Sequence, residues 1–523
     1  MPRRLTICLK MAGLLWVAKS IAIATSYGAD LRSLGLENAW TTQAKVSSDG
    51  RGVISAELWL DSTQQLEFAI VELSDTTLRI AANQLGPDLK PLGMEGARAA
   101  VNAQAVRLLG KADGFEVTEK AIGQLRLIVT NSEGLVQCFD AETGRLQWAT
   151  PCGDYGAPTY PAALSEAGVV LVRGDRVYLL DWLSGKQLAE KRLPSSTGVA
   201  AAALEVGDSE RGKDNAEEVA SNSVAFVVDL TGLVSGYSLN DTLPPWTSRI
   251  VGRNVVAPVS LPDRSAVAIA TDKGWLYVIS GVGSPKVQFR YESGSRITGS
   301  LAAGDDAFYV GDVSGNFSKI STRQQGNLEW NHRLPQSISA KPLIDFSNGI
   351  VFVSTEAGEL TAIEDSTGFP AWSPSTDTGT RVRAPLAVCN GSVICRTNAD
   401  SLVAFDAKSG QVLNQSSSLP LSDLIVTNSM TDRLYLLELD GRLKCYHPIG
   451  RTLPRIAAVY EGQSKANVED TQTEGSSAVN PGSQANQELD TMESDSGSDP
   501  FATETAQPGT EESDGDPFAE GTP

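Results

Sequence analysis

The side chains that could carry catalysis or bind a metal are few in this chain of 523 residues. It has two histidines, His332 and His447, and neither stands beside a cysteine or an acidic cluster at ligand spacing. A histidine-based zinc site or a Ser–His–Asp arrangement needs more such side chains than the chain supplies. We expect both histidines to be surface residues, and we assign no catalytic, cofactor-binding or metal-binding residue.

Carboxylates are the remaining candidates for chemistry. Asp305, Asp306 and Asp312 are acidic residues of the kind that could hold a calcium ion or serve a cofactor. They also suit turns between strands, which is the interpretation we favour. The sequence has neither a Gly-x-Ser-x-Gly motif nor a phosphate-binding Gly-x4-Gly-Lys-Ser/Thr motif.

The cysteines do not suggest a redox centre. Beyond Cys8 near the N-terminus, five remain, and an odd number in an exported protein leaves at least one thiol free. Cys138 and Cys445 occupy equivalent positions in two repeat units, and we expect both to be small core residues. The sequence does not decide whether two of the five cysteines form a disulfide. The five are Cys138, Cys152, Cys389, Cys395 and Cys445.

These residues belong to a pattern that repeats along the chain. In "GLVQCFDAETGRLQW", a glycine precedes an apolar strand, a polar turn and a second strand that ends in a bulky residue. Successive starts lie 41, 57, 42, 41, 43, 42 and 41 residues apart, which marks a repeat with one insertion. The starts are Gly134, Asp175, Gly232, Gly274, Gly315, Gly358, Asp400 and Gly441.

Each unit predicts about four strands. Runs of β-branched and aromatic residues such as "GVVLVRG" and "GIVFVST" precede each hairpin, and a further short run such as "KPLID" precedes those. About 42 residues and four strands per unit are typical of propeller blades. The sequence therefore predicts an all-β, eight-bladed β-propeller with four antiparallel strands per blade over residues 121–460.

The bulky residue that closes the hairpin falls 14 or 15 positions after the start of its unit. Such a side chain packs between neighbouring blades, since an indole buries a large area and its N–H can reach a partner. The residues of this kind are Trp148, Trp246, Phe289, Trp330 and Trp372.

The first of these stretches also resembles a known motif. Asp140, Thr143, Gly144 and Trp148, followed by Gly153, resemble the tryptophan-docking motif of PQQ-like repeats, although Cys138 stands where alanine is usual. Partial copies keep Asp406 and Gly410 in one unit, and Gly368 and Trp372 in another. The resemblance covers roughly residues 120–460.

The resemblance implies an eight-bladed propeller and two classes of function. The BamB-like proteins are non-enzymatic scaffolds, and their best-known member helps to assemble outer-membrane β-barrels. The quinoprotein dehydrogenases bind PQQ and calcium, but some of them carry an adjacent Cys-Cys pair that this chain lacks. We favour a non-enzymatic scaffold of the cell envelope that has no cofactor and binds protein partners, with the outer-membrane assembly machinery as a candidate partner. The alternatives are a PQQ- and calcium-dependent oxidoreductase and, more weakly, a binder of envelope polysaccharide.

The N-terminus predicts export. Arg3, Arg4 and Lys10 precede the apolar run "MAGLLWVAKSIAIA", and Ala22-Ile-Ala24 offers a cleavage site, so residues 1–24 read as a signal peptide. The Sec and twin-arginine routes both stay open. Cys8 follows a bulky isoleucine, so we do not expect a lipoprotein. We expect a protein of the periplasm or cell envelope with no transmembrane segment in its mature form.

Residues 30–120 contain strand-like runs without a clean repeat. We expect this N-terminal segment to supply the outer strand that closes the last blade. The alternative is that "TTLRIAANQLGPDLKPLG" forms a degenerate ninth hairpin. The long interval between units contains a charged insertion, residues 205–223, which predicts a surface loop.

The C-terminal region, residues 461–523, predicts a disordered acidic tail. Between Gln463 and Pro523 there are 14 acidic residues and one lysine, which account for most of the net charge of −20. This charge argues against nucleic-acid binding. "DPFA" occurs twice, with Phe501 and Phe518 the only aromatic residues of the tail, so the pair is either a bivalent docking peptide or a duplicated fragment of a solubilising tail. We expect a monomeric propeller.

Overall fold

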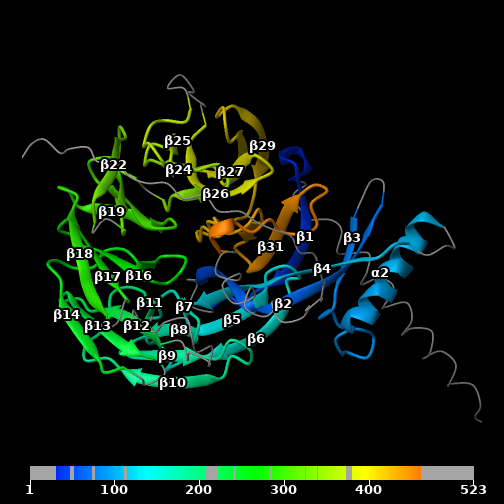
Figure 1. The fold of residues 1–523 in the computed structure, drawn as a ribbon, viewed down its shortest axis with the longest axis horizontal. Coiled ribbons are helices and arrows are strands. Elements are labelled where there is room, and N and C mark those ends of the chain that lie inside the picture. Colours follow the sequence, from blue (N-terminus) through cyan, green and yellow to red (C-terminus); the bar gives the residue numbers. More distant parts are fainter. Residues whose placement is uncertain are drawn as a thin grey trace, which may run out of the picture. The chain divides into compact units, whose positions relative to one another are not determined.

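The computed structural model shows eight antiparallel sheets arranged as the blades of a ring (Figure 1). The structure describes residues 31–47, 52–73, 77–110, 115–206, 222–239, 243–281, 285–323, 326–338, 340–372 and 380–460. The prediction of an all-β, eight-bladed propeller is confirmed. The predicted signal peptide, most of the charged insertion and the acidic tail lie outside the described residues.

Blades 1 to 4 follow one another along the chain, and in each the innermost strand comes first. Their strands are, for blade 1, β2 (Val53–Glu72), β4 (Thr118–Asn131), β5 (Leu135–Asp140) and β6 (Leu146–Pro151); for blade 2, β7 (Ala163–Ser165), β8 (Gly168–Arg173), β9 (Arg176–Leu180) and β10 (Gln187–Arg192); for blade 3, β11 (Ala202–Val206), β12 (Asn222–Val228), β13 (Leu233–Ser238) and β14 (Trp246–Arg249); and for blade 4, β15 (Val259–Ser260), β16 (Ala266–Ala270), β17 (Trp275–Ser280) and β18 (Lys286–Glu292).

Blades 5 to 8 complete the ring. Their strands are, for blade 5, β19 (Ile297–Ala303), β20 (Ala307–Asp312), β21 (Asn316–Ser321) and β22 (Leu328–Arg333); for blade 6, β23 (Leu343–Asp345), β24 (Ile350–Ser354) and β25 (Leu360–Glu364); for blade 7, β26 (Val382–Cys389), β27 (Ser392–Thr397), β28 (Ser401–Asp406) and β29 (Val412–Ser418); and for blade 8, β30 (Leu434–Leu437), β31 (Arg442–Pro448) and β1 (Leu36–Gln43).

The core lies between the blades. The middle strands are buried on both faces, and β8 is buried at all six positions. This is why these segments read as continuous apolar runs rather than as alternating ones: each blade face is covered by a neighbour. Ile128 and Cys138 of blade 1, for example, share one cluster with Leu171 and Tyr178 of blade 2.

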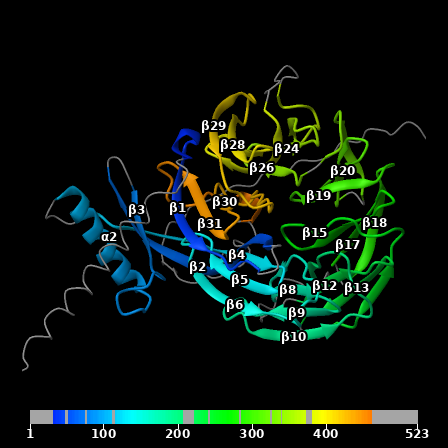
Figure 2. The ribbon, with the colours of Figure 1, turned by 180° about the vertical axis from the view of Figure 1, so that it is seen from behind.

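The ring closes through strands from opposite ends of the repeat domain. After the short helix η1 (Leu31–Leu34), β1 pairs antiparallel with β31, with Glu37 opposite His447. Figures 1 and 2 show β1 beside β31 from both sides. The N-terminal segment thus forms the outermost strand of the last blade, and the first and last blades become neighbours.

Blade 1 carries an extension, residues 62–123, between its innermost and second strands. The first half of β2 pairs with the blade part of β4, and after a bulge near Asp61 the second half pairs with the start of β4 and with β3 (Thr77–Ala81). Helix α2 (Gly93–Leu109) packs on this sheet through Ala97, Val101 and Ala105. It ends at Gly110, whose φ of 64° gives a left-handed cap.

Several details differ from the sequence-based expectations. The stretch suggested as a ninth hairpin forms β3, an isolated bridge between Leu85 and Pro91, and the approach to α2, so it adds no blade. The helix α2 itself was not predicted. The insertion is also shorter than proposed, because Glu205 and Val206 belong to β11 and Ser223 belongs to β12.

The innermost strands run in the same direction around the ring, so the turns that follow them lie on one side. We call this side the inner-turn face. It carries the turns after β7, β15, β19, β23 and β26, and the ends of β11 and β12 from which the insertion departs. In blade 1 the extension takes the place of this turn.

Candidate partner-binding site

The bulky residues of the repeat motif dock on the turn of the following blade. Trp148 donates its Nε1 hydrogen to the carbonyl oxygen of Trp182 at 2.8 Å, and its ring lies against Gly185. Trp330 and Trp372 donate in the same way to Asp365 and Ala407, at 2.7 and 3.0 Å. The rings of Phe289, Trp330 and Trp372 lie against three turn glycines with positive φ, namely Gly326, Gly368 and Gly410.

The remaining motif residues have related positions. Trp246 is half-buried and packs edge-to-face on Phe226, at 5.6 Å between ring centroids, in the cluster between blades 3 and 4. Gly153 has a φ of 67° and lies beside Tyr178 of blade 2. The repeat also includes Trp40 of β1, which the repeat spacing did not reveal because β1 precedes the first unit.

The motif aspartates cap their own turns. Oδ1 of Asp140 accepts hydrogen bonds from the backbone N–H groups of Glu142 and Thr143, at 3.0 and 2.9 Å. Asp406 caps its turn in the same way, and hydrogen bonds from Ser409 hold the pKa of Asp406 below its usual value. Burial raises the pKa of Asp140. These carboxylates are occupied in the fold rather than directed at a ligand.

The other acidic candidates are not brought together. Asp305 and Asp306 face Arg323 at 3.6 and 2.8 Å, at the start of β20. Asp312 is buried at the other end of that strand, where Oδ1 accepts the backbone N–H groups of Ser314 and Asn316. Within the described ranges, no group of three His, Cys, Asp or Glu side chains could hold a metal ion.

The expectation of two surface histidines is wrong for His447. It lies within β31 rather than in a turn and is only 7% exposed, because β1 covers it. Burial lowers its pKa, and Nδ1 lies 3.6 Å from Oε1 of Glu37. His332 is half-buried, with Nδ1 3.1 Å from the carbonyl oxygen of Gly368.

The five cysteines in the described part of the chain are free and buried. Cys138 and Cys445 are core residues, at 0% and 1% exposure. Burial raises the pKa of the Cys138 thiol to about 12 and that of the Cys152 thiol to about 11. Such thiols are poor nucleophiles at neutral pH.

A buried ion network joins the extension, the first blade and the last blade on the inner-turn face. Arg433 of blade 8 is fully buried, and its Nε lies 3.2 Å from Oε1 of Glu142 in blade 1. Arg79 of the extension reaches the other oxygen of Glu142 at 2.9 Å. Nη2 of Arg433 also donates to the carbonyl oxygen of Thr452 at 2.9 Å, so the network fixes the segment that follows β31.

That segment, Arg451–Tyr460, runs along blade 8 on the inner-turn face. Oδ1 of Asp432 accepts the backbone N–H of Arg455 at 3.0 Å, and the N–H of Ala457 donates to the carbonyl oxygen of Met430 at 2.9 Å. Tyr460 packs edge-to-face on Phe346 of blade 6, at 5.8 Å between centroids.

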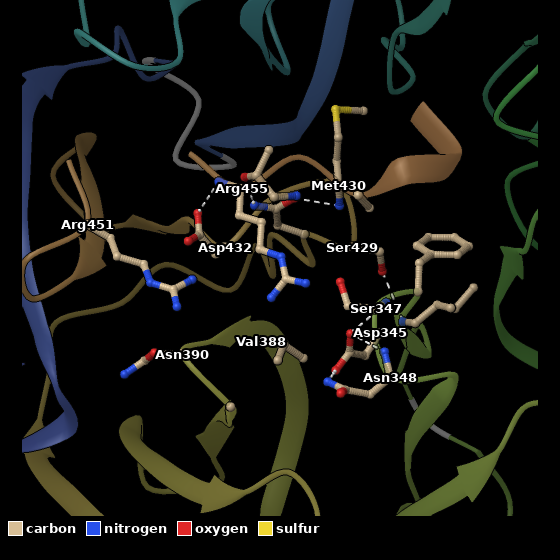
Figure 3. Close-up of a pocket in the computed structure, with 16 residues that line it drawn as sticks. Asp345, Ser347, Asn348, Val388, Asn390, Ser429, Met430, Asp432, Arg451 and Arg455 are labelled. Atoms are coloured by element: carbon tan, nitrogen blue, oxygen red, sulfur yellow. Dashed lines mark hydrogen bonds between the residues drawn. The ribbon is translucent and has the colours of Figure 1, made fainter. Parts of the chain in front are cut away.

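A small pocket lies between this segment and the inner turns of blades 6 and 7 (Figure 3). It has a volume of about 100 Å³. In Figure 3 the side chain of Arg451 points toward Asn390, and the side chain of Arg455 points into the middle of the pocket. Asn390 and Gly391 both have positive φ, at 50° and 79°, as in a two-residue hairpin turn that turns the asparagine toward the pocket.

A larger hollow of about 280 Å³ opens at the ring centre and adjoins this pocket. The two cavities share Ile344, Asn428, Ser429 and Met430 in their linings. The innermost strands of most blades contribute to the wall of the hollow, with Lys341, Arg264 and Tyr460 among the polar residues. We call it the central hollow.

Arg264, in the wall of the central hollow, interacts with the charges of Glu166 and Glu205. Arg264 has a positive φ of 59° and stacks on Trp59 of β2, with 5.0 Å from its guanidinium to the ring centroid. Desolvation by the surrounding protein and, second, the negative charge of Glu205 raise the pKa of Glu166 to about 7. Glu205 also accepts the backbone N–H of Glu166 at 3.1 Å.

Sequence reasoning did not find the pocket, because its residues come from four separate segments. Phe501 and Phe518, the predicted docking residues, lie outside the described residues. Among the helices in the part of the chain that the structure describes, none is long and apolar enough to cross a membrane.

Comparison with known proteins places the repeats in one family. The model of the family described as outer membrane protein assembly factor BamB matches residues 132–346 and 325–451.

Two curated relatives carry the same description. That of Nitrosomonas eutropha is 23% identical over 188 residues, which are 35% of this chain and 45% of the relative. That of Moranella endobia is 22% identical over 368 residues, which are 66% of this chain and 81% of the relative. The chain therefore spans less than half of the first relative and about four fifths of the second.

Among solved structures, BamB from Moraxella catarrhalis aligns with a TM-score of 0.45 and 18% identity. The alignment covers 62% of this chain and 93% of that structure.

Proposed function

Since this chain belongs to the family of outer membrane protein assembly factor BamB, we propose that it is a non-enzymatic scaffold of the cell envelope that binds protein partners of outer-membrane assembly. The match of the family model over the propeller is the observation that carries this proposal. The proposed location is the periplasm or the periplasmic surface of the outer membrane.

The arrangement of the inner-turn face supports binding of proteins there. The extension of blade 1, the ends of the blade 3 insertion and the pocket lie on this face, and the central hollow adjoins the pocket. Loops held by a rigid propeller are common sites of recognition, because the scaffold fixes their relative positions. The opposite side carries the turns between the second and third strands and the connections from one blade to the next, such as residues 152–162.

The proposal is tested in cells that lack the chain. We expect a lower amount of folded β-barrel protein in the outer membrane, restored by the full chain supplied from a plasmid. A photo-crosslinking residue at Asp263, an exposed position in the inner turn of blade 4, should capture assembly proteins more efficiently than one at Leu439 on the opposite side.

The oxidoreductase alternative gives a different result. A PQQ enzyme would show a higher melting temperature as PQQ and calcium are added, together with dye reduction by alcohols or sugars. Unchanged outer-membrane β-barrels in the deletion strain, together with PQQ-dependent turnover, would overturn the scaffold proposal.

A further inference from the structure

We propose that the pocket between blades 6, 7 and 8 binds the carboxylate of an acidic residue in an extended peptide of a partner protein, with an apolar residue of that peptide beside it. The inference rests on the proposed function and names the chemistry by which the scaffold would recognise a partner.

The pocket contains two guanidinium groups that are available to a ligand. Arg451 and Arg455 are exposed, and within the described residues neither side chain donates a hydrogen bond or forms an ion pair. Arginine favours carboxylates because its N–H groups match the two carboxylate oxygens. In Figure 3 the side chain of Arg451 points toward Asn390, whose amide can also donate a hydrogen bond, and the side chain of Arg455 points into the middle of the pocket above Val388.

The backbone beneath these arginines is held in place while their side chains remain available. The carbonyl oxygen of Arg451 accepts from Nη1 of the buried Arg433 at 3.4 Å, and the N–H of Arg455 donates to Asp432 at 3.0 Å. Asn428 fixes the facing turn before β30, where its Oδ1 accepts the N–H groups of Met430 and Thr431 at 3.0 and 3.1 Å. A fixed backbone lowers the entropy cost of binding at this site.

The carboxylates of the pocket offset only part of this positive charge, with Asp432 interacting with Arg451 as well as with Arg433. Asp345 is committed to its own turn, where it accepts from the N–H of Ser347 at 3.0 Å and from the amide of Asn348 at 2.6 Å. Asp432 is 6% exposed and has Nη1 of Arg433 at 3.2 Å from its Oδ1. The exposed charges of the pocket are therefore positive, in a chain whose net charge is −20.

Apolar side chains complete the wall. Phe346, Val388, Met430 and Ala457 line the pocket beside the polar groups. A volume of about 100 Å³ suits one acidic side chain rather than a cofactor or drug-sized ligand, which need roughly 300 Å³ or more. The apolar wall gives the residue next to the carboxylate a surface to pack on.

The adjoining central hollow favours a peptide over an isolated anion. It shares Ile344 and Met430 with the pocket, and it adds the exposed Lys341 to the lining. An extended chain held at Arg451 and Arg455 can continue along this wall. A membrane of anionic lipids would require a broad basic face, whereas these arginines line a recess between blade turns.

The test measures binding of a labelled peptide, acetyl-Gly-Ser-Asp-Phe-Ala-Ser-amide, to the full chain by fluorescence anisotropy. A second peptide carries Asn in place of Asp, and neither has a free terminal carboxylate. The protein variants are Arg451→Gln, Arg455→Gln and, as matched control, Arg253→Gln, an exposed arginine in the connection between β14 and β15. The chain's own acidic stretch is the same in every variant, so differences between variants report on the pocket.

We expect each pocket variant to weaken binding of the Asp peptide at least fivefold, the control variant to bind unchanged, and the Asn peptide to lose most of its affinity. Equal binding by all four proteins would overturn the proposal. So would binding of phosphatidylglycerol vesicles that depends on Arg451 and Arg455 when the peptide does not bind. Either negative result leaves the outer-membrane phenotype of the deletion strain as a separate test of the scaffold function.

Discussion

Trp40 of β1 lies over Gly144 of blade 1 and donates its Nε1 hydrogen to the carbonyl oxygen of Ala141 at 3.0 Å. This contact joins the outermost strand of the last blade to the first blade. It repeats the docking of Trp148, Trp330 and Trp372 on the blades that follow them. The ring is thus joined at its closure by the same contact that joins its consecutive blades.

Replacing Gly144 by alanine should weaken the closure. A Cβ atom there would come 2.5 Å from Cε3 of Trp40, and the φ of 70° is unfavourable for alanine. We expect the free energy of unfolding to fall by about 2–4 kcal/mol. Gly294→Ala is the matched control, because it has a φ of 76° and open space around it, and it should cost only about 1 kcal/mol. Urea unfolding measures both, and equal losses would refute the closure contact.

Replacing Trp372 by phenylalanine should show the value of the indole hydrogen bond. The change keeps most of the packing but leaves the carbonyl oxygen of Ala407 without this donor. We expect a loss of about 1–2 kcal/mol in urea unfolding. Trp275→Phe serves as control, since Trp275 is half-buried and stacks under Arg290. A loss no larger than that of the control would show that the hydrogen bond adds nothing.

The Arg433–Glu142 pair should be more important to stability than a surface pair. Arg433→Met leaves the buried Glu142 with Arg79 alone, and we expect a loss of about 3–5 kcal/mol. Arg442→Gln removes the pairs of Arg442 with Asp440 and Glu438 at the surface, and because Glu438 keeps Lys444 as a partner, we expect a much smaller loss. The double variant Arg433→Met/Glu142→Gln should recover part of the loss, and strictly additive losses would contradict the coupling.

Glu166 should make stability depend on pH. Its pKa of about 7 in the folded protein exceeds its usual 4.5, so between these values the folded chain binds a proton that the unfolded chain does not. Its contribution therefore favours folding below about pH 4.5–5 and is lost as pH rises through 7. Glu166→Gln should flatten the decline in unfolding free energy between pH 5 and 8, measured by urea unfolding. The exposed Glu72→Gln is the control, and parallel profiles for both variants and the unaltered chain would disprove the effect.

The buried thiols should resist modification. Iodoacetamide at pH 8 should label none of the five cysteines in the described residues while the protein is folded, because burial raises the pKa of each thiol. All five should react in urea. Mass spectrometry of the labelled peptides gives the result, and rapid labelling of Cys138 in the folded protein would show that blades 1 and 2 separate.

The fold was predictable because its signal repeats. The spacing of the glycine starts and the β-branched runs reflect blades that bury both faces, and the tryptophans reflect docking between blades. Helix α2 was missed because its buried side chains are Ala97, Val101 and Ala105. Such small residues give only a weak amphipathic pattern, and no glycine start or bulky closing residue marks the segment.

The pocket and the burial of His447 could not be found in this way. His447 is covered because β1 pairs with β31, a contact between the two ends of the repeat domain. The pocket depends on the return of Arg451 and Arg455 along blade 8, which the buried Arg433 holds. Local patterns carry no information on such contacts, because the partners are hundreds of residues apart or lie outside the repeat.

The pairing of Glu37 with His447 also constrains the order of assembly during synthesis. A nascent chain that has emerged only as far as β29 can pair the strands of its first seven blades, but β1 has no strand to join. If the chain crosses a membrane from its N-terminus, the circle is sealed only after β31 arrives on the far side. Until then, the unpaired edge of β1 can pair with strands of other chains. A chaperone that prevents aggregation would therefore bind the chain at this stage.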